Sequence, residues 1–250
     1  MNLDWIKVRS LLTPDRIALV DPIKNSEWTY KEVNVRAENL AHYLKKNGVT
    51  KGDRVALYAP NDISYFDVLL ASIKIGAIFI PLNWRLKPIE IKKVVEDAQP
   101  KVILHASQIS KRLSLVDASL LSLDVDSKEY NEICEHPNHV PFLSESIELE
   151  SPVMLIYTTG TTGDPKGAII THNGMVNNSM NTIISWNITH EDITIASAPM
   201  FHIAGLSGMI IPLMLIGGKV IIDRYFDGTN TNEMIKQYKP TMLFMVPTMY

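Results

Sequence analysis

The sequence predicts an α/β fold in which sheets are flanked by helices. Short runs that are apolar at every position alternate with longer segments whose apolar residues recur at helical spacing, and glycine or proline separates the two kinds. Uniformly apolar strands are typical of parallel sheets covered by helices on both faces. The 250 residues, 46% hydrophobic and 20% charged, are enough for one large domain or two small ones.

The first part of the chain shows this alternation in order. Thr29 and Glu32 have the spacing of a capping box, and apolar residues then follow at helical intervals until Gly48 supplies a stop. Further expected elements are a strand over residues 54–59, a helix over 62–75, a strand over 77–80, a helix that begins at Pro88 and a strand over 101–105. Strands and helices in this order are typical of βαβ units.

The pattern divides the chain into three parts. Residues 107–150 are polar and acidic without a period, which predicts an irregular connection between a first lobe, residues 1–106, and a second lobe, residues 151–250. In the second lobe we expect strands over 153–157, 168–171, 193–198, 219–222 and 241–246. A helix over 173–185 is expected to turn Met180, Ile183 and Ile184 inward.

Charge and composition exclude several classes of protein. A net charge of -3, from 24 basic and 27 acidic residues, offers no field that holds nucleic acid or an anionic membrane. The single cysteine, Cys134, excludes an internal disulfide, and the charged N-terminus does not resemble a signal peptide, so a cytoplasmic protein is expected. Residues 193–218 lack formal charge, but Pro199, Pro212 and Gly217 interrupt them, which argues against a transmembrane span.

Ten residues between two expected strands, 158–167 (TTGTTGDPKG), have the composition of a phosphate-binding loop. Three glycines allow backbone N–H groups to converge, four threonines add hydroxyl donors, and Lys166 adds a positive charge. Phosphate oxygens need many converging donors, and a charge-assisted bond from lysine is about twice as strong as a neutral one. The loop is therefore expected to bind a polyphosphate.

Two alternatives for this loop are weighed. A hairpin turn needs only two to five residues, so a segment of this length and donor content is not expected to serve as a turn alone. A Walker-type loop requires G-x-x-x-x-G-K-[ST], but Lys166 follows a proline here and Gly167 stands where a hydroxyl should bind magnesium.

Four segments resemble the adenylate-forming, or AMP-binding, enzyme superfamily. Residues 157–167 (YTTGTTGDPKG) are similar to its signature motif, with Thr159 where the usual form has serine. Residues 28–33 (WTYKEV), 73–83 (IKIGAIFIPLN) and 199–206 (PMFHIAGL) resemble further family segments, and their order agrees from about Pro14 to Pro247. The last segment is more similar to the AMP-forming acyl-CoA synthetases than to peptide-synthetase domains.

The resemblance implies the incomplete large N-terminal domain of the adenylate-forming fold, with mixed sheets flanked by helices. It implies an acid–thiol ligase that joins a carboxylic acid to ATP, releases pyrophosphate and passes the acyl group to coenzyme A, with Mg²⁺ as a further cofactor. The ATP-binding residues carried over are Thr158, Thr159, Gly160, Thr161, Thr162, Gly163, Asp164, Pro165 and Lys166. No metal ligand and no catalytic residue is assigned within this portion.

The segment 199–206 supplies the expected acyl-binding residues Phe201, His202 and Gly205. On residue type alone His202 has a competing interpretation as a satisfied core histidine, whereas Met200, Leu206 and Met209 are expected to be ordinary core. Cys134, His136 and His139 lie close in sequence, but a structural zinc site usually needs a second ligand pair, so a solvated loop is expected there.

The family's later motifs, for magnesium, ribose, the hinge and the small C-terminal domain with its lysine, are absent from these 250 residues. We therefore expect ligase activity only when the rest of such a polypeptide is present. The alternatives are a non-catalytic nucleotide- or acyl-binding fragment, or another adenylate-forming enzyme of the luciferase-like or peptide-synthetase kind. Long-chain fatty, aromatic and succinylbenzoate-type acids are all compatible substrates, and a homodimer stays open.

Overall fold

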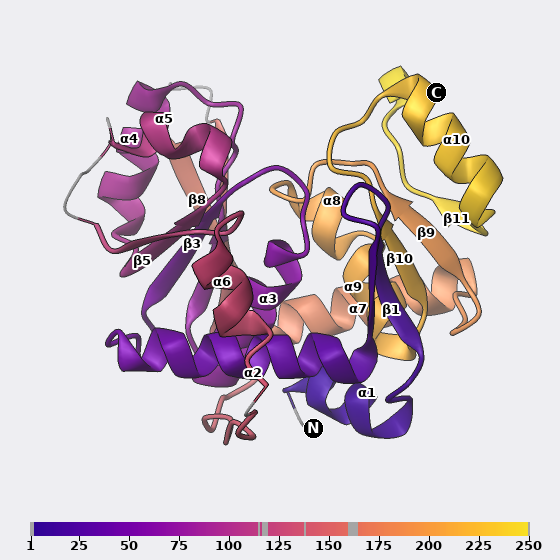
Figure 1. The fold of residues 1–250 in the computed structure, drawn as a ribbon, viewed down its shortest axis with the longest axis horizontal. Coiled ribbons are helices and arrows are strands. Elements are labelled where there is room, and N and C mark those ends of the chain that lie inside the picture. The colour runs from indigo at the N-terminus through magenta and orange to yellow at the C-terminus, as the bar shows by residue number, and fades with distance from the viewer. Residues whose placement is uncertain (1–2, 115, 117–119, 138, 160–164, 250) are drawn as a thin grey trace. The chain divides into compact units, whose positions relative to one another are not determined.

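The computed structural model describes residues 3–114, 116, 120–137, 139–159 and 165–249. These residues form two compact units. The first unit contains the residues up to 34, residues 60–63, and the residues from 174 onward, and the second contains 35–59 and 64–173. Each unit has its own sheet (Figure 1).

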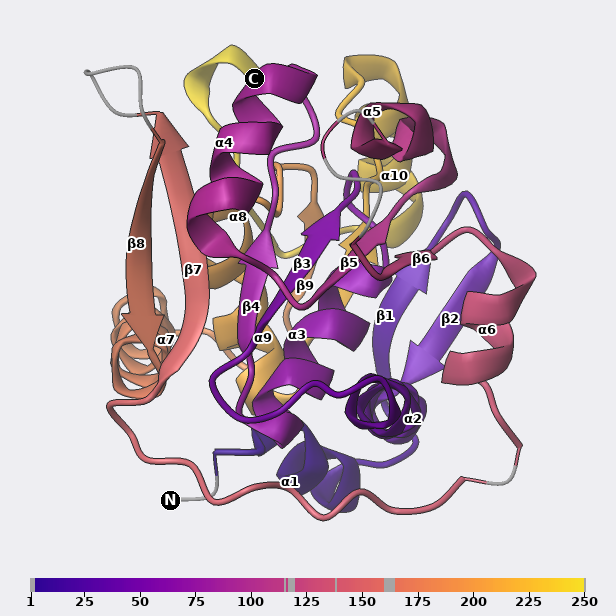
Figure 2. The same ribbon diagram turned by 90° about the vertical axis from the view of Figure 1, so that its left-hand side faces the viewer.

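The second unit is built on a six-stranded sheet in the order β6-β5-β3-β4-β7-β8 (Figure 2). The strands are β3 (Arg54–Tyr58), β4 (Ile78–Pro81), β5 (Val102–His105), β6 (Ser122–Asp124), β7 (Pro152–Thr159) and β8 (Pro165–Thr171). Neighbouring strands are parallel, as their uniformly apolar sequences predict, except that β8 is antiparallel to β7. The sheet is therefore mixed.

The helices of the second unit up to residue 98 begin and end close to the expected residues, whereas the short helices within 107–134 were not expected. The helices of this unit are α2 (Tyr30–Lys46, whose first turn belongs to the first unit), α3 (Ser64–Ile75), α4 (Pro88–Ala98), α5 (Ser110–Ser114), α6 (Lys128–Cys134) and the short η1 (Ser107–Ile109). The predicted capping box before α2 is present, because Thr29 N donates to Glu32 Oε2 at 2.7 Å and Glu32 N donates to Thr29 Oγ1 at 3.2 Å. Every residue of α3 is buried where it packs on β3 and β4.

The first unit contains a five-stranded sheet in the order β11-β9-β10-β1-β2. Its strands are β1 (Ile17–Asp21), β2 (Ser26–Thr29), β9 (Ile193–Ala196), β10 (Lys219–Ile222) and β11 (Met242–Leu243). Its helices are α1 (Trp5–Leu12), α7 (His172–Trp186, whose first two residues belong to the second unit), α8 (Ile203–Ser207), α9 (Ile210–Ile216), α10 (Gly228–Tyr238) and η2 (Pro247–Met249). Strands β1, β10, β9 and β11 are parallel, so their carboxyl ends lie at one edge of the sheet.

This division differs from the expected lobes 1–106 and 151–250. Strand β1 pairs with β10, so residues from both ends of the chain share one sheet. The expected irregular connection, 107–150, instead contains β6 and α6, and β6 is an edge strand of the second unit's sheet. A strand of three residues and a helix of two turns are too short to show a period, and local patterns do not indicate which distant strands pair.

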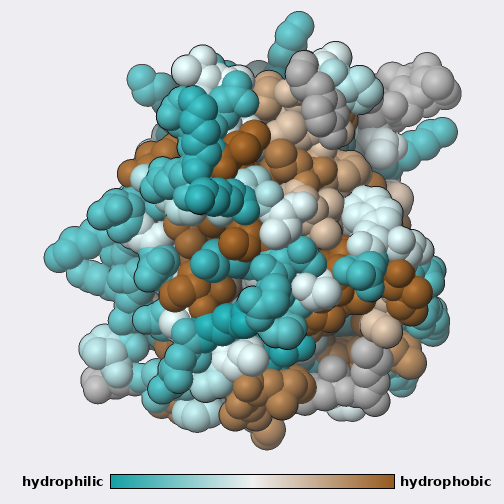
Figure 3. Space-filling model, turned by 90° about the vertical axis from the view of Figure 1, so that its right-hand side faces the viewer, coloured by the Kyte–Doolittle hydropathy of each residue, from teal (hydrophilic) through white to brown (hydrophobic). Residues whose placement is uncertain are grey.

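The uncharged stretch 193–218 forms β9, α8 and α9 rather than one continuous helix. Within the described part of the chain, no helix has both the length and the apolar character that crossing a membrane requires. Helix α7 corrects one expectation, because Met180 and Ile184 are 47% and 72% exposed instead of facing inward. Exposed hydrophobic residues are also visible on the surface shown in Figure 3, the side that carries α10 in Figure 1, where hydrophobic patches lie between hydrophilic ones.

Candidate functional site

The glycine and threonine segment lies at the tip of a hairpin in the second unit. Strand β7 extends to Thr159 and β8 begins at Pro165, with Thr158 opposite Lys166 in the antiparallel register. The expected ten-residue loop is therefore longer than the connection between the two strands. The expectation that the segment is too long to connect the strands of a hairpin is wrong. Threonine is β-branched and fits a pleated strand, which explains why the strand continues into the motif. Residues 160–164 (Gly160, Thr161, Thr162, Gly163 and Asp164) lie outside the described residues.

The described residues beside this tip present polar groups to solvent. Thr158 and Lys166 are exposed, and Pro165 is half-buried. Gly167 stands opposite Tyr157, and a Cβ at Gly167 would lie 2.8 Å from Leu155 Cδ1 and 3.2 Å from Tyr157 Cζ. A larger residue at position 167 would therefore require the Leu155 side chain to shift.

A hydrogen bond joins the part of this hairpin next to its tip to helix α4. The Tyr157 hydroxyl donates to Asp97 Oδ2 at 2.5 Å. Burial, together with the hydrogen bond to the Asp97 carboxylate, raises the pKa of Tyr157 well above its ordinary value, so the hydroxyl stays a neutral donor. The sequence motif contains the tyrosine, but no local signal identifies its partner sixty residues away.

His172, which begins α7 directly after β8, was missed by the sequence interpretation. Its side chain is fully buried and neither ring nitrogen has a protein hydrogen-bond partner. Burial lowers the pKa of His172 from 6.5 to about 4, so the ring is neutral at pH 7. His172 stands at the junction of a strand and a helix, where neither the strand nor the helix period indicates which side chains are buried. The sequence therefore gives no signal of its burial.

The expected acyl-binding residues lie together in the first unit, in the turn that leaves β9 and enters α8. Phe201 is buried, whereas His202 is exposed at the N-cap position of α8. Their ring centroids are 4.6 Å apart with a tilt of 46°. The competing interpretation of His202 as a core histidine is therefore wrong. Met200, Leu206 and Met209 are buried, as expected for core residues.

Gly205 has a packing role that the motif alone does not reveal. A Cβ at this position would lie 2.1 Å from the carbonyl oxygen of Pro199, which is closer than real side chains approach. Gly205 therefore lets α8 pack directly against the turn that carries Phe201 and His202. Its contact with a substrate remains a prediction.

The group Cys134, His136 and His139 differs from the expected solvated loop. Cys134 is fully buried at the end of α6, and its carbonyl accepts a hydrogen bond from Asn39 Nδ2 at 2.9 Å. His139 Nε2 lies 2.5 Å from Glu38 Oε2. Among the residues that the structure describes, no group of three or more His, Cys, Asp or Glu side chains is arranged to hold a metal ion.

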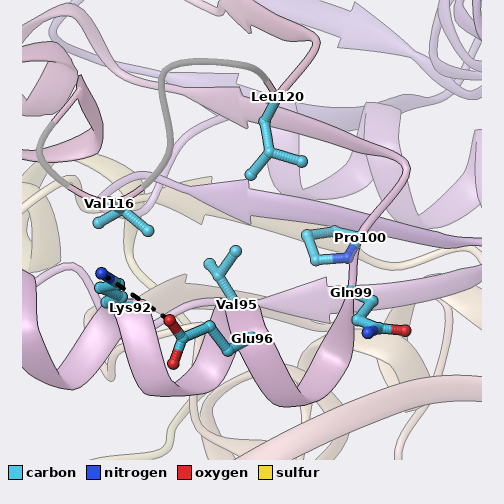
Figure 4. A pocket seen from close by; sticks show the side chains of 7 residues that line it. All are labelled: Lys92, Val95, Glu96, Gln99, Pro100, Val116 and Leu120. Atoms are coloured by element: carbon cyan, nitrogen blue, oxygen red, sulfur yellow. Dashed lines mark ion pairs between the residues drawn. The ribbon is translucent and has the colours of Figure 1, made fainter.

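A cavity of about 610 Å³ lies beside α4 in the second unit (Figure 4). Lys92 and Glu96, 3.9 Å apart as an ion pair, line it together with apolar side chains. The full lining comprises Lys92, Val95, Glu96, Gln99, Pro100, Val116 and Leu120. None of these seven is a predicted site residue, so the cavity does not belong to the candidate site.

The chain belongs to the AMP-binding enzyme family, whose model matches residues 8–250. This match confirms the resemblance noted in the four sequence segments, and with it the α/β fold of mixed sheets flanked by helices.

Three known proteins illustrate the similarity. The chain is 34% identical over 222 residues to a feruloyl-CoA synthase of Amycolatopsis sp, covering 89% of this chain and 44% of that protein. It is 27% identical to a long-chain-fatty-acid–CoA ligase of Mycobacterium tuberculosis, covering 98% and 50%. The o-succinylbenzoate CoA synthetase of Bacillus subtilis, solved in complex with an acyl-adenylate intermediate, matches with a TM-score of 0.86 at 26% identity, covering 98% of this chain and 62% of that one. The chain spans about half the length of the curated relatives it matches.

Proposed function

We propose that the chain carries the phosphate-binding and acyl-binding residues of an ATP-dependent acid–thiol ligase. The observation that supports this most is the hairpin of β7 and β8, which places exposed Thr158 and Lys166 opposite each other on its two strands, beside the glycine- and threonine-rich connection. Family membership over residues 8–250 supports a nucleotide as the ligand. The relatives named above are, by their names, CoA ligases or synthetases of different acids.

The proposed reaction has two steps. A carboxylate oxygen attacks the α-phosphorus of ATP, the bond to the bridging oxygen breaks, and pyrophosphate leaves as acyl-AMP forms. The thiolate of coenzyme A then attacks the acyl carbon and AMP leaves. Both steps depend on orienting the reactants and stabilising charge on leaving groups rather than on a protein nucleophile.

In this proposal the hairpin holds the β- and γ-phosphates during the first step. Lys166 supplies a charge-assisted donor, and the hydroxyls and N–H groups of residues 158–164 supply neutral ones. Mg²⁺, when bound, would supply further positive charge to the leaving pyrophosphate, and none of the residues assigned here is proposed to hold it. Tyr157 supports the hairpin through its hydrogen bond to Asp97.

Phe201, His202 and Gly205 are the proposed carboxylate-binding residues of the first unit. His202 is exposed and rests on the Phe201 ring, so its imidazole can contact a bound acid. The acid itself is either aromatic or long-chain. Relatives with names of both kinds match this chain, which supports a common carboxylate-activating site with a variable acyl pocket.

Release of pyrophosphate tests this proposal. The complete polypeptide, given ATP, Mg²⁺, coenzyme A and a panel of aromatic and long-chain acids, is expected to release pyrophosphate only when an acid is present. The 250 residues alone are expected to release none. Acid-independent ATP cleavage, or no cleavage with any acid, would instead favour a nucleotide- or acyl-binding protein without ligase activity.

Lys166→Ala tests the role of the hairpin. Removing the charge-assisted donor is expected to lower acid-dependent pyrophosphate release by about a hundredfold. The matched control is Lys128→Ala, since Lys128 is also an exposed lysine of the second unit, 90% accessible on α6. Equal rates in wild type and Lys166→Ala would remove the hairpin from the mechanism.

A further inference from the structure

Asn61 occupies an unusual position in the chain. Residues 60–63 belong to the first unit, although the residues on both sides of them belong to the second. Asn61 is only 4% exposed. Neither the phosphate motif nor the acyl-binding segment contains it.

The Asn61 amide contacts the main chain of two segments, residues 196–200 and Asp223. Its Nδ2 donates to the carbonyls of Ala196, Ala198 and Asp223 at 2.8, 3.0 and 3.1 Å. Its Oδ1 accepts the N–H of Met200 at 2.9 Å. One side chain therefore provides hydrogen-bond partners for main-chain groups at the end of β9, in the turn that follows β9 and at the residue after β10.

Two of these bonds are made to the residues on either side of Pro199, whose carbonyl accepts a hydrogen bond from the His202 main chain. Ala198 and Met200 are the two neighbours of Pro199, and the Pro199 carbonyl accepts the N–H of His202 at 3.1 Å. The same carbonyl is the atom against which α8 packs at Gly205. The Asn61 amide thus fixes both flanks of Pro199, and Pro199 fixes the start of α8 where His202 stands.

The pattern of bonds requires an asparagine. The side-chain amide has two N–H donors and a carbonyl acceptor in one plane, which matches carbonyl groups on one side and an N–H group on the other. Aspartate has acceptors only when ionised, alanine leaves the buried groups unpaired, and glutamine is one methylene too long. Each buried group left unpaired is costly.

We infer that Asn61 is a positioning residue for the carboxylate-activating reaction, acting through the Pro199 turn to place His202 at the bound acid. This inference rests on the proposed function. It assigns to Asn61 control over binding of the acid and none over binding of ATP. Displacement of the turn would therefore raise KM for the carboxylic acid and leave KM for ATP unchanged.

The kinetic experiment compares Asn61→Ala and Asn61→Asp with wild type in the complete polypeptide. We expect KM for the carboxylic acid to rise about tenfold or more, because small misplacements of positioning groups have large effects, while KM for ATP stays within about twofold. The Asn61→Asp variant keeps the size and the acceptor for Met200, so it tests the donors even if Asn61→Ala unfolds. Asn39→Ala is the matched control, since Asn39 is also a buried amide that donates to a main-chain carbonyl, in the second unit.

A pH profile adds a readout that loss of stability alone would not give. Protonated aspartate carries one O–H donor, and a carboxyl surrounded by carbonyl oxygens has a raised pKa. The acid KM of Asn61→Asp is therefore expected to fall back toward wild type as the pH is lowered, relative to the wild-type profile. An equal rise of both KM values, or no rise in either, would overturn the inference.

A second readout does not depend on activity. The ¹³Cε1 signal of His202 in histidine-labelled protein, assigned by its loss in His202→Gln, is expected to shift or broaden in both Asn61 variants and not in Asn39→Ala. An unchanged His202 signal in the Asn61 variants would overturn the positioning role. If wild type shows no acid-dependent pyrophosphate release, the proposed function fails, while the His202 signal still decides whether Asn61 holds the turn.

Discussion

Phe201 and His202 are neighbours in sequence with opposite environments. Phe201 is 3% exposed and packs inside the first unit, whereas His202 begins α8 in contact with solvent. The motif PMFHIAGL identified both residues, but residue type favoured a buried histidine. The exposure of His202 depends on the turn at Pro199, whose bonds to Asn61 come from a distant segment with no recognisable motif.

Gly205→Ala tests the close approach of α8 to this turn. The added Cβ would lie 2.1 Å from the Pro199 carbonyl, so one of the two segments must move, and we expect a loss of about 2 kcal/mol in the free energy of unfolding. Urea unfolding measures it. Gly228→Ala is the control, because no atom lies within 4 Å of a Cβ there, and it is expected to be neutral or stabilising by less than about 1 kcal/mol. Equal stability of Gly205→Ala and wild type would contradict the packing described.

His172 gives the protein an acid-sensitive contribution to stability. Its folded-state pKa of about 4 lies below the ordinary 6.5, so between these values the unfolded chain binds a proton that the folded chain does not. Stability from this group is therefore present above about pH 6.5 and is lost as the pH falls toward about 4. We expect His172→Phe to reduce the loss of unfolding free energy across this window, measured by urea unfolding at its two ends. An unchanged slope would show that the ring is not held neutral.

At the scale of elements, the sequence predicted the helices and strands that are long enough to show a clear hydrophobic pattern. The helices α2, α3 and α4 and the strands β3, β4 and β5 appear near the expected residues, because caps, spacing and apolar runs are local signals. The signals failed at β6 and α6, which are short, and at the hairpin, where threonines with strand preference were assigned to a loop. They also missed the ionic contacts that hold α6 in place.

Helix α6 is held by a buried ion pair between α2 and α3. Arg36 donates to both oxygens of Asp67, from Nε at 3.0 Å and from Nη2 at 2.8 Å, and the Tyr130 hydroxyl of α6 donates to Asp67 Oδ2 at 2.8 Å. Arg36 Nη1 also lies 2.7 Å from Glu135 Oε1. Both members of the Arg36 and Asp67 pair are almost fully buried.

Asp67→Leu is expected to reduce the free energy of unfolding by about 3–5 kcal/mol, because it removes the buried carboxylate that accepts two hydrogen bonds from the buried Arg36 guanidinium. The double variant Arg36→Met, Asp67→Leu is expected to recover part of that loss. Lys128→Ala, which removes an exposed ion pair with Glu132, should cost less than about 1 kcal/mol. The single variant Arg36→Met completes the comparison. If the losses of unfolding free energy in the two single variants simply add in the double variant, the pair is not coupled and this account is contradicted.

At the scale of the whole molecule, family membership was accessible from the sequence and the division into units was not. Motifs are continuous in sequence, so residues 157–167 and 199–206 were recognisable. The units depend on pairing between distant strands, such as β1 with β10, and on the four residues 60–63 that join the first unit. Neither feature has a local signal.

The path of one oxygen atom tests the proposed ligase reaction most directly. A carboxylic acid labelled with ¹⁸O is incubated with ATP, Mg²⁺, coenzyme A and the complete polypeptide, and the nucleotide product is weighed by mass spectrometry. Attack of the carboxylate on the α-phosphorus predicts AMP that carries one ¹⁸O atom, together with unlabelled pyrophosphate and an acyl-CoA that keeps the other carboxylate oxygen. Unlabelled AMP, or ADP with labelled phosphate, would contradict activation of the acid as an acyl-adenylate.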